Sequence, residues 1–310
     1  MGDVTFTAQT NFENNMRLRL NQVKPKLAIH ALERDCAGKE KQKIDNLIDN
    51  EATRTKTERE TDVIYDQTGW DGIWLAKPDA EYKSKLIDND DKLATEVDLE
   101  GGEVMKQSAA INRAWDDAFL VGFYGDLITG KSGTVLNPFP VANVVPVDLR
   151  VTGTGATGMN TKKLKRALRI LTQNFVDLDQ ELFVALTAQA IEDLQGEIEV
   201  TSSDFTKLGG RMSPDGKYLI GMLGFTFVPI ELANPLLKFG SALSLTTDGN
   251  NYRKLPFWSA DGMVMGVWER LFTSVDPLPG KHHAHQVYSR TTVTASRTDQ
   301  NRCGYILVAE

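Results

Sequence analysis

Residues 103–128 read EVMKQSAAINRAWDDAFLVGFYGDLI. Apolar and small side chains recur in this stretch at helical spacing, at Ile111, Trp115, Ala118, Phe119 and Gly122. The spacing predicts one long helix that buries a single face. The helix runs directly into Gly125, and glycine commonly ends helices because it tolerates the left-handed backbone conformation.

A phosphate-loop pattern begins where this helix is expected to end. Gly125, four further residues and Gly130-Lys131-Ser132 match G-x-x-x-x-G-K-[ST]. A working phosphate loop needs a buried strand before it and a helix after it, so that backbone N–H groups face the anion. Here a helix precedes the motif, and the proline-containing stretch GTVLNPFPVANVVPV (133–147) follows it. We therefore interpret Gly125 and Gly130 as helix-stop signals and predict no phosphate site.

A second glycine pattern follows at Gly153-x-Gly155-x-x-Gly158. It precedes a predicted helix that Asn160 or Thr161 would cap, and apolar residues recur at helical spacing within it. A dinucleotide site also needs an acid at the end of the next strand. Asp177 and Asp179 are the candidates, but they lie in the loop before the strand LFVAL (182–186). We favour a flexible linker between two domains, with a cofactor site as the alternative.

The segment before the long helix is rich in charge and poor in apolar residues. Residues 33–62 read ERDCAGKEKQKIDNLIDNEATRTKTERETD, in which Ile44, Leu47 and Ile48 form one short helical stripe. Such a segment buries little by itself. It is either a solvated, disordered arm or an arm that neighbouring chains order.

Residues 61–98 are predicted to form a long ribbon around the turn GWDG (69–72). Both faces of this ribbon are polar, and a lone two-stranded ribbon is marginally stable in water. We therefore expect it to rest on another molecule, with Trp70 and Trp74 near its tip buried between subunits.

The C-terminal half predicts a compact α/β or α+β unit over residues 160–280. The buried strand LFVAL ends at Thr187, which can cap a short helix that Gly196 ends. In the tail, Val287, Val293 and Ala295 share one strand face, and Tyr288, Arg290 and Thr292 share the other, before a final strand Tyr305–Val308. The strict alternation of the sequence predicts these two faces.

No catalytic, cofactor or metal site emerges from the residue types. His282, His283 and His285 form a cluster that lacks an evident fourth ligand, so we interpret it as a polar loop. The two cysteines, Cys36 and Cys303, suggest neither a disulfide framework nor a zinc site. A net charge of −7 argues against tight non-specific binding of nucleic acid by the whole surface. With neither a signal peptide nor an apolar run of membrane-spanning length, we expect a soluble protein made in a cytoplasm.

The order of these parts resembles the tailed-bacteriophage major capsid protein with the Hong Kong 97 type fold. KLIDNDDKL (85–93) followed by AINRAWDDAF (110–119) is similar to the end of the extended loop and the spine helix of that family. The stretches LFVALTAQAIEDLQGEIEVTSSDF and GMLGFTFVPI resemble its axial domain. HQVYSRTTVTASRTDQNRCGYILV resembles its closing strands, and the match spans about residues 60–310.

The resemblance implies an α+β capsid fold with an arm, an extended β-ribbon loop, a long spine helix, a peripheral domain and an axial α/β domain. The implied boundaries are 1–60 for the arm, 61–98 for the extended loop, 99–158 for the peripheral domain with spine helix and linker, 159–284 for the axial domain and 285–310 for the closing strands. The candidate inter-subunit contacts are Trp70, Trp74, Lys77, Asp88, Asp90 and Asp91.

The implied function is self-assembly, as hexamers and pentamers, into an icosahedral shell around a phage genome. The implied partners are the chain itself, scaffold, portal and decoration proteins, and packaged DNA through weak non-specific contacts, with no membrane and no cofactor. The virion capsid, assembled in the host cytoplasm, is the expected location. Two alternatives remain: a nanocompartment shell of the same fold, and a nucleotide-binding enzyme that uses Gly125–Ser132 or Gly153–Gly158.

Overall fold

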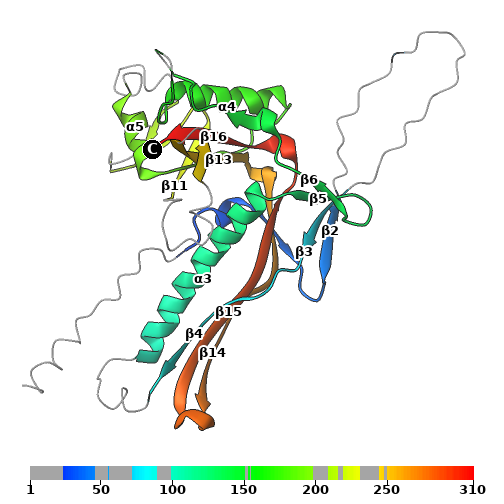
Figure 1. Cartoon of the computed structure of the whole chain (residues 1–310), viewed down its shortest axis with the longest axis vertical. Coiled ribbons are helices and arrows are strands. Elements are labelled where there is room, and N and C mark those ends of the chain that lie inside the picture. The colour runs from blue at the N-terminus through cyan, green and yellow to red at the C-terminus, as the bar shows by residue number, and fades with distance from the viewer. Residues whose placement is uncertain are drawn as a thin grey trace, which may run out of the picture.

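The computed structural model describes residues 24–45, 55, 72–88, 99–150, 153, 155–197, 209–215, 219–230, 244–247 and 250–310. A compact α/β unit lies at one end, and a long helix with a long, narrow sheet extends away from it (Figure 1). Within the described part of the chain, no helix has the length and apolar character needed to cross a membrane.

The predicted long helix is α3, Leu99–Tyr124. It buries the side of the helix that the spacing indicated, including Ile111, Trp115 and Phe119. Gly122 marks the closest approach to the neighbouring strand, because a Cβ atom there would lie 2.2 Å from the backbone oxygen of Ala295. Only glycine fits at this contact. The predicted helix and its predicted buried face are both confirmed.

The long sheet has four strands in the order β1–β14–β15–β4, and α3 lies along it (Figure 1). Their bounds are β1 Leu32–Asp35, β14 Met263–Leu278, β15 Ala284–Arg297 and β4 Glu81–Ile87. Strands β14 and β15 form a hairpin whose turn is the 3-10 helix η7, Pro279–Lys281. Val287, Val293 and Ala295 are buried, as the alternation predicts. Thr292 is also buried, against expectation, where the register of β14 shifts beside it at Glu269.

The compact unit is built on an eight-stranded sheet in the order β7–β16–β13–β8–β11–β10–β9, with β12 paired to β13. The strands are β7 Val144–Val145, β8 Leu182–Leu186, β9 Arg211–Met212, β10 Leu219–Met222, β11 Phe225–Pro229, β12 Ser244–Thr247, β13 Asn250–Ser259 and β16 Cys303–Ala309. Every residue of β8 is buried, which fits an apolar run in the interior of a sheet.

Among the described residues, the compact unit includes two α-helices: α4, Thr161–Gln173, and α5, Ala188–Gly196. Asn160 caps α4 by accepting the Lys163 N–H at 2.9 Å. Thr187 caps α5 by accepting the Ala190 N–H at 3.1 Å. Both caps are predicted from residue type and position, and both are confirmed.

The charged segment is ordered by its own chain where the structure describes it, so the expectation of an arm that is disordered or ordered only by neighbours is wrong there. Strand β1 runs parallel to β14, and β2, Lys41–Asp45, pairs with β3, Gly72–Ala76. Ile44 lies in a strand rather than on a helical stripe. A few apolar side chains suffice, because Cys36 packs with Ile73 and Leu75 in a small cluster beneath these strands.

The strands expected to form one ribbon over 61–98 pair with partners outside it. Strand β3 pairs with β2, whereas β4 pairs with β15 of the long sheet. The expected closing pair also separates, because β15 belongs to the long sheet and β16 to the compact sheet. Each strand pairs where it can complete its backbone hydrogen bonds beside a buried face, and these partners are distant in sequence.

One core connects the two parts of the molecule. Phe119 and Phe123 of α3 meet Trp258 of β13 with ring centroids 5.0 and 6.2 Å apart. Both cysteines, Cys36 and Cys303, are free and buried. Burial raises the pKa of the Cys303 thiol to about 12, so this thiol stays protonated.

Candidate assembly surfaces and glycine motifs

The first glycine motif joins α3 to a β-hairpin. The Gly125 N–H donates to the Val121 carbonyl at 2.8 Å, which ends the helix as predicted. Strands β5, Leu127–Thr129, and β6, Val135–Asn137, then form the hairpin, and Gly130 lies in its turn at φ +89°. Gly130 is therefore a turn residue rather than a helix stop. With a helix before it and a hairpin after it, the motif does not present its N–H groups to a phosphate.

Trp74 packs against this same turn in its own chain. Its indole N–H donates to the Gly130 carbonyl at 2.7 Å. A Cβ atom on Gly133, at φ +66°, would lie 2.8 Å from the indole Cγ. The glycines of the motif therefore make room for Trp74, whose side chain remains half-buried.

The other candidate contact residues do not form one cluster. Lys77 and Asp88 are exposed; Lys77 directly follows β3, and Asp88 directly follows β4. Lys77 is near Trp74, since its N–H donates to the Glu40 carbonyl at 3.0 Å beside the β2–β3 pair. Trp70, Asp90 and Asp91 lie outside the described residues.

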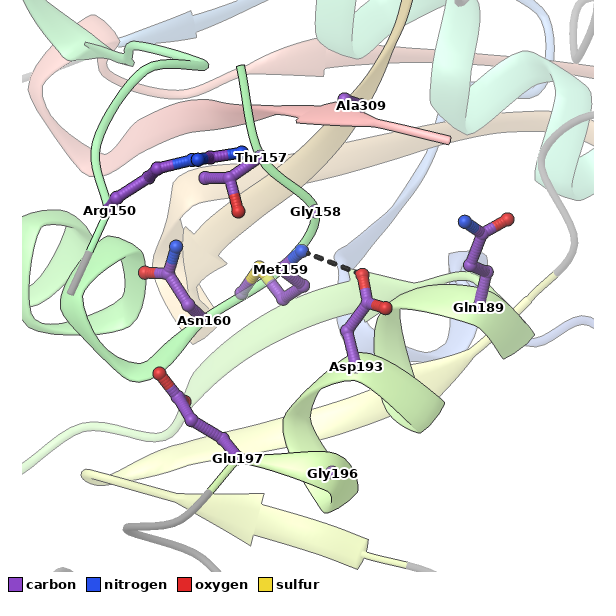
Figure 2. Close-up of a pocket in the computed structure, with 10 residues that line it drawn as sticks. All are labelled: Arg150, Thr157, Gly158, Met159, Asn160, Gln189, Asp193, Gly196, Glu197 and Ala309. Carbon is purple, nitrogen blue, oxygen red and sulfur yellow. Dashed lines mark hydrogen bonds between the residues drawn. The ribbon is translucent and has the colours of Figure 1, made fainter. Parts of the chain in front are cut away.

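The second glycine motif leads into α4, whose N-terminus lines a pocket of about 490 Å³ together with α5 (Figure 2). Asp193 of α5 points at this N-terminus and accepts the Met159 N–H at 3.0 Å. Glu197, just after α5, accepts the Thr161 N–H at 2.7 Å. A Cβ atom on Gly158 would lie 2.0 Å from a carboxylate oxygen of Asp193, so a larger residue there would have to displace this carboxylate.

These carboxylates occupy the positions at which a nucleotide phosphate would bind. Helix N-termini attract anions, and this one is already satisfied by two acids of the same chain. A phosphate would meet their like charge. Asp177 and Asp179 lie in the loop before β8, as the sequence indicates. The geometry therefore favours a structural role for both glycine motifs.

The histidine cluster lies at the tip of the β14–β15 hairpin. His282 and His283 have left-handed backbones, with φ of 50° and 57°, and His285 lies in β15. Over the described residues, no group of three or more histidine, cysteine, aspartate or glutamate side chains is placed to hold a metal ion.

Three buried charged residues that were not predicted from the sequence hold separate parts of the chain together. Asp116 accepts the backbone N–H groups of Lys26, Leu27 and Ala28, which fixes the N-terminal segment to α3. Arg297 donates to the carbonyls of Phe123 and Gly125 at the end of α3. Lys163 lies buried in the compact unit. The signal available for Asp116 is its place beside Trp115 on the apolar face of a helix, where a carboxylate needs partners.

A row of rings crosses the side of the long sheet opposite α3. Tyr82 of β4 stacks on Tyr288 of β15 with centroids 5.9 Å apart, and Phe272 of β14 meets Tyr288 at 6.5 Å. The Arg290 guanidinium lies 4.9 Å from the Phe272 centroid and forms a 2.8 Å ion pair with Glu269. Tyr82 is 69% exposed and Phe272 is 42% exposed, so this aromatic row is open to a partner.

Solved capsid structures share this architecture at low sequence identity. The capsid of the cyanophage P-SCSP1u superposes with a TM-score of 0.67 at 11% identity, covering 96% of this chain and 91% of that chain. The capsid of Ralstonia phage GP4 gives a TM-score of 0.67 at 11% identity, covering 94% and 93%. The capsid asymmetric unit of cyanophage Pam1 gives 0.64 at 11% identity, covering 100% and 99%. A search among curated proteins gives no match.

A family model described as "Phage capsid protein" matches residues 4–310. The match includes the arm and both sheets, so it concerns nearly the whole chain rather than one module. The chain therefore belongs to the phage capsid protein family and is a major capsid protein that forms the shell.

Proposed function

We propose that copies of this chain close as hexamers and pentamers into an icosahedral shell around a phage genome. The observation that carries this proposal is the exposed aromatic row on the long sheet, defined by Tyr82, Phe272 and Tyr288. A monomer gains nothing from aromatic rings exposed to water, whereas an interface gains strongly from them. In a shell, the neighbours available to cover these rings are further copies of the same chain.

The proposed contacts include the candidate residues of the ribbon. The extended loop is expected over residues 61–98, but β3 within that range pairs with β2. We therefore propose residues 46–71, between these two strands, as the part of the chain that contacts a neighbour. Trp70 lies within it, and Trp74 and Lys77 lie at its base. Asp88, Asp90 and Asp91 follow β4 and are proposed as acidic contacts with a neighbouring subunit.

The shell wall is proposed to hold DNA weakly, because the net charge of −7 repels phosphate as a whole. Scaffold, portal and decoration proteins are the proposed further partners, and assembly in the host cytoplasm yields the virion capsid. We also propose a purely structural role without catalysis or a cofactor. The carboxylates that satisfy the α4 N-terminus support this part of the proposal.

The test is sedimentation of the purified chain beside a variant of the aromatic row, Tyr82→Ser with Phe272→Ser. The wild type should form fast-sedimenting particles, and the variant should remain largely as subunits with an unchanged circular dichroism spectrum. Equal assembly by both chains would argue against this surface. Shells that enclose a protein cargo rather than nucleic acid would favour a nanocompartment of the same fold.

A further inference from the structure

Helix α4 ends on an exposed aromatic residue in a left-handed conformation. The Phe175 N–H donates to the Thr172 carbonyl at 3.1 Å, and the Val176 N–H donates to the Leu171 carbonyl at 3.0 Å. This pair of bonds defines a Schellman motif, in which the left-handed residue is usually glycine. Phe175 occupies that place with φ of 58°. A Cβ atom makes this backbone conformation unfavourable, so the phenylalanine has an energetic cost.

The subunit itself gains little in return for that cost. The Phe175 side chain is 89% exposed, so its ring is not packed into the core of its own chain. An exposed aromatic residue on a strained backbone is a feature that function, rather than folding, explains.

Two further exposed apolar residues belong to segments next to this helix end: Val141 of the 3-10 turn η3 (Val141–Asn143), and Leu178 of the loop that follows Phe175. We call Val141, Phe175 and Leu178 together the α4 tip. Val141 is 86% exposed and Leu178 is 46% exposed. The Asn174 amide joins the helix end to the segment that carries Val141, because it donates to the Asn143 side chain at 3.2 Å and also to the Asn301 carbonyl at 3.0 Å. Asn143 belongs to the same turn, η3, as Val141.

The α4 tip is held rigidly as well as exposed. Besides the Asn174 bonds, the Asp177 carboxylate accepts the Asp179 N–H at 3.0 Å and fixes the loop that carries Leu178. A patch fixed in this way loses little conformational entropy when it binds, which favours its use as a contact.

Charges of opposite sign flank the tip on the two sides. The outward face of α4 carries exposed Lys162, Lys165 and Arg169, which lead along the helix toward Phe175. The loop beyond the tip carries exposed Asp177, Asp179 and Glu181. Two copies can therefore place the basic face of one α4 opposite the acidic loop of the other, with the apolar residues between them. DNA would be repelled by the acidic loop.

We infer that the α4 tip is a contact between copies of this chain, with Phe175 as its anchor. The inference rests on the proposed shell function, since it names one of the surfaces through which the copies associate.

The first experiment replaces the anchor with the residue that the backbone prefers, Phe175→Gly. The melting temperature of the isolated subunit should stay equal or rise, because the left-handed conformation is relieved. The subunit concentration needed for half-maximal assembly should rise by about tenfold or more, since a central aromatic anchor commonly contributes at least that factor. A lower melting temperature or unchanged assembly would overturn the inference.

The matched control is His282→Gly, which relieves an exposed left-handed residue at the β14–β15 tip, far from α4 in the fold. It should leave assembly unchanged. If it weakens assembly as much as Phe175→Gly does, backbone relief rather than loss of the anchor explains the effect, and the inference fails.

A charge exchange tests the identity of the partner. Asp179→Lys with Glu181→Lys should weaken assembly, and so should Lys162→Glu with Arg169→Glu. All four substitutions in one chain should restore assembly, because the two surfaces are again complementary. A fourfold variant no better than either double variant contradicts the inference. So does an α4 double variant that assembles normally but retains less DNA.

Failure of the wild type to form shells would count against the proposed function. The α4 tip is still tested in that case by self-association of the soluble subunit in analytical ultracentrifugation. The wild type should form oligomers that Phe175→Gly does not form. Identical behaviour of the two chains would overturn the inference.

Discussion

At the scale of single residues, buried charges connect parts of the chain that are distant in sequence. Lys163 is an example: its ammonium group donates to the carbonyls of Thr157 at 2.7 Å and Leu307 at 2.8 Å. It thereby holds α4 against the last strand, β16. Burial lowers the pKa of Lys163 from 10.5 to about 8.

This lowered pKa predicts how stability depends on pH. Between about pH 8 and about pH 10.5 the unfolded chain keeps the Lys163 proton while the folded chain releases it, so stability contributed by this residue rises with pH. Relative to Lys163→Met, the free energy of unfolding of the wild type should rise by about 1–3 kcal/mol across that window. Denaturant titrations of both chains at the two ends of this pH window measure the difference. If the free energy of unfolding changes equally with pH in the two chains, the lowered pKa of Lys163 is contradicted.

Replacing Arg297 should change the free energy of unfolding by more than the pH-dependent change expected at Lys163. This loss should not depend on pH in the neutral range. Arg297→Met leaves the Phe123 and Gly125 carbonyls at the end of α3 without their donor. The variant should lose about 2–4 kcal/mol of unfolding free energy, because buried carbonyls would lack partners. Arg297→Lys, which keeps one charged donor, should lose less. Equal losses in the two variants would show that side-chain volume rather than hydrogen bonding matters.

At the scale of elements, the packing of α3 on β15 depends on a single glycine. Gly122→Ala would force a Cβ atom to within 2.2 Å of the Ala295 oxygen, so the variant should lose about 3 kcal/mol. Gly196→Ala is the matched control, since the end of α5 has open space around it. It should be neutral or gain about 0.5–1 kcal/mol. The melting temperatures of the two variants are compared by thermal unfolding. Equal melting temperatures would contradict the close contact between Gly122 and Ala295.

The first glycine motif yields an element-scale prediction as well. Lys131 is exposed in the β5–β6 turn, so Lys131→Ala should leave assembly intact. Neither chain should bind ATP or GTP in calorimetry. Micromolar binding by the wild type that this substitution abolishes would reverse the interpretation of the motif.

Elements that depend on local signals could be predicted, and pairings between distant segments could not. Periodicity and caps were sufficient for α3, α4, α5 and β8, because each signal lies within the element. The partners of β2, β4 and β16 depend on segments far away in the chain. Residues 33–45 were misjudged because charge density indicates weak burial, although one cysteine and a few apolar side chains can still order a segment beside an existing sheet.

Only part of the candidate site could be predicted from the sequence. The chemistry of the two glycine motifs could be rejected from the order of elements around them. The acids that close the α4 N-terminus, Asp193 of α5 and Glu197 just after it, are 34 and 36 residues from the N–H groups they accept, so only the fold brings them there. Phe175 gave no signal in the sequence, because its exposure and its backbone conformation are properties of the folded helix end.

At the scale of the whole molecule, the described chain combines a compact sheet with a long, thin extension (Figure 1). The extension carries the exposed rings of Tyr82 and Phe272. Such a shape has a large surface for its core and is best stabilised by neighbours. The contacts proposed between copies are each modest, and many of them acting together hold a closed shell.

The proposed contact loop between β2 and β3 gives a test at this scale. Replacing residues 46–71 with a short glycine–serine linker should leave β2 paired with β3 in a folded, soluble subunit. Because the loop would contact neighbours rather than its own core, the shortened chain should fail to close into shells. Within the loop, Trp70→Ala should weaken assembly before it lowers the melting temperature. Unfolding of the shortened chain would place the loop in the core instead.

The most direct test of the central claim is electron cryomicroscopy of the purified, full-length chain expressed without other phage proteins. We expect closed, icosahedrally symmetric particles in which the aromatic row of Tyr82, Phe272 and Tyr288 and the α4 tip both lie between subunits. Particles with both surfaces open to solvent, or a chain that remains monomeric at every concentration, would contradict it.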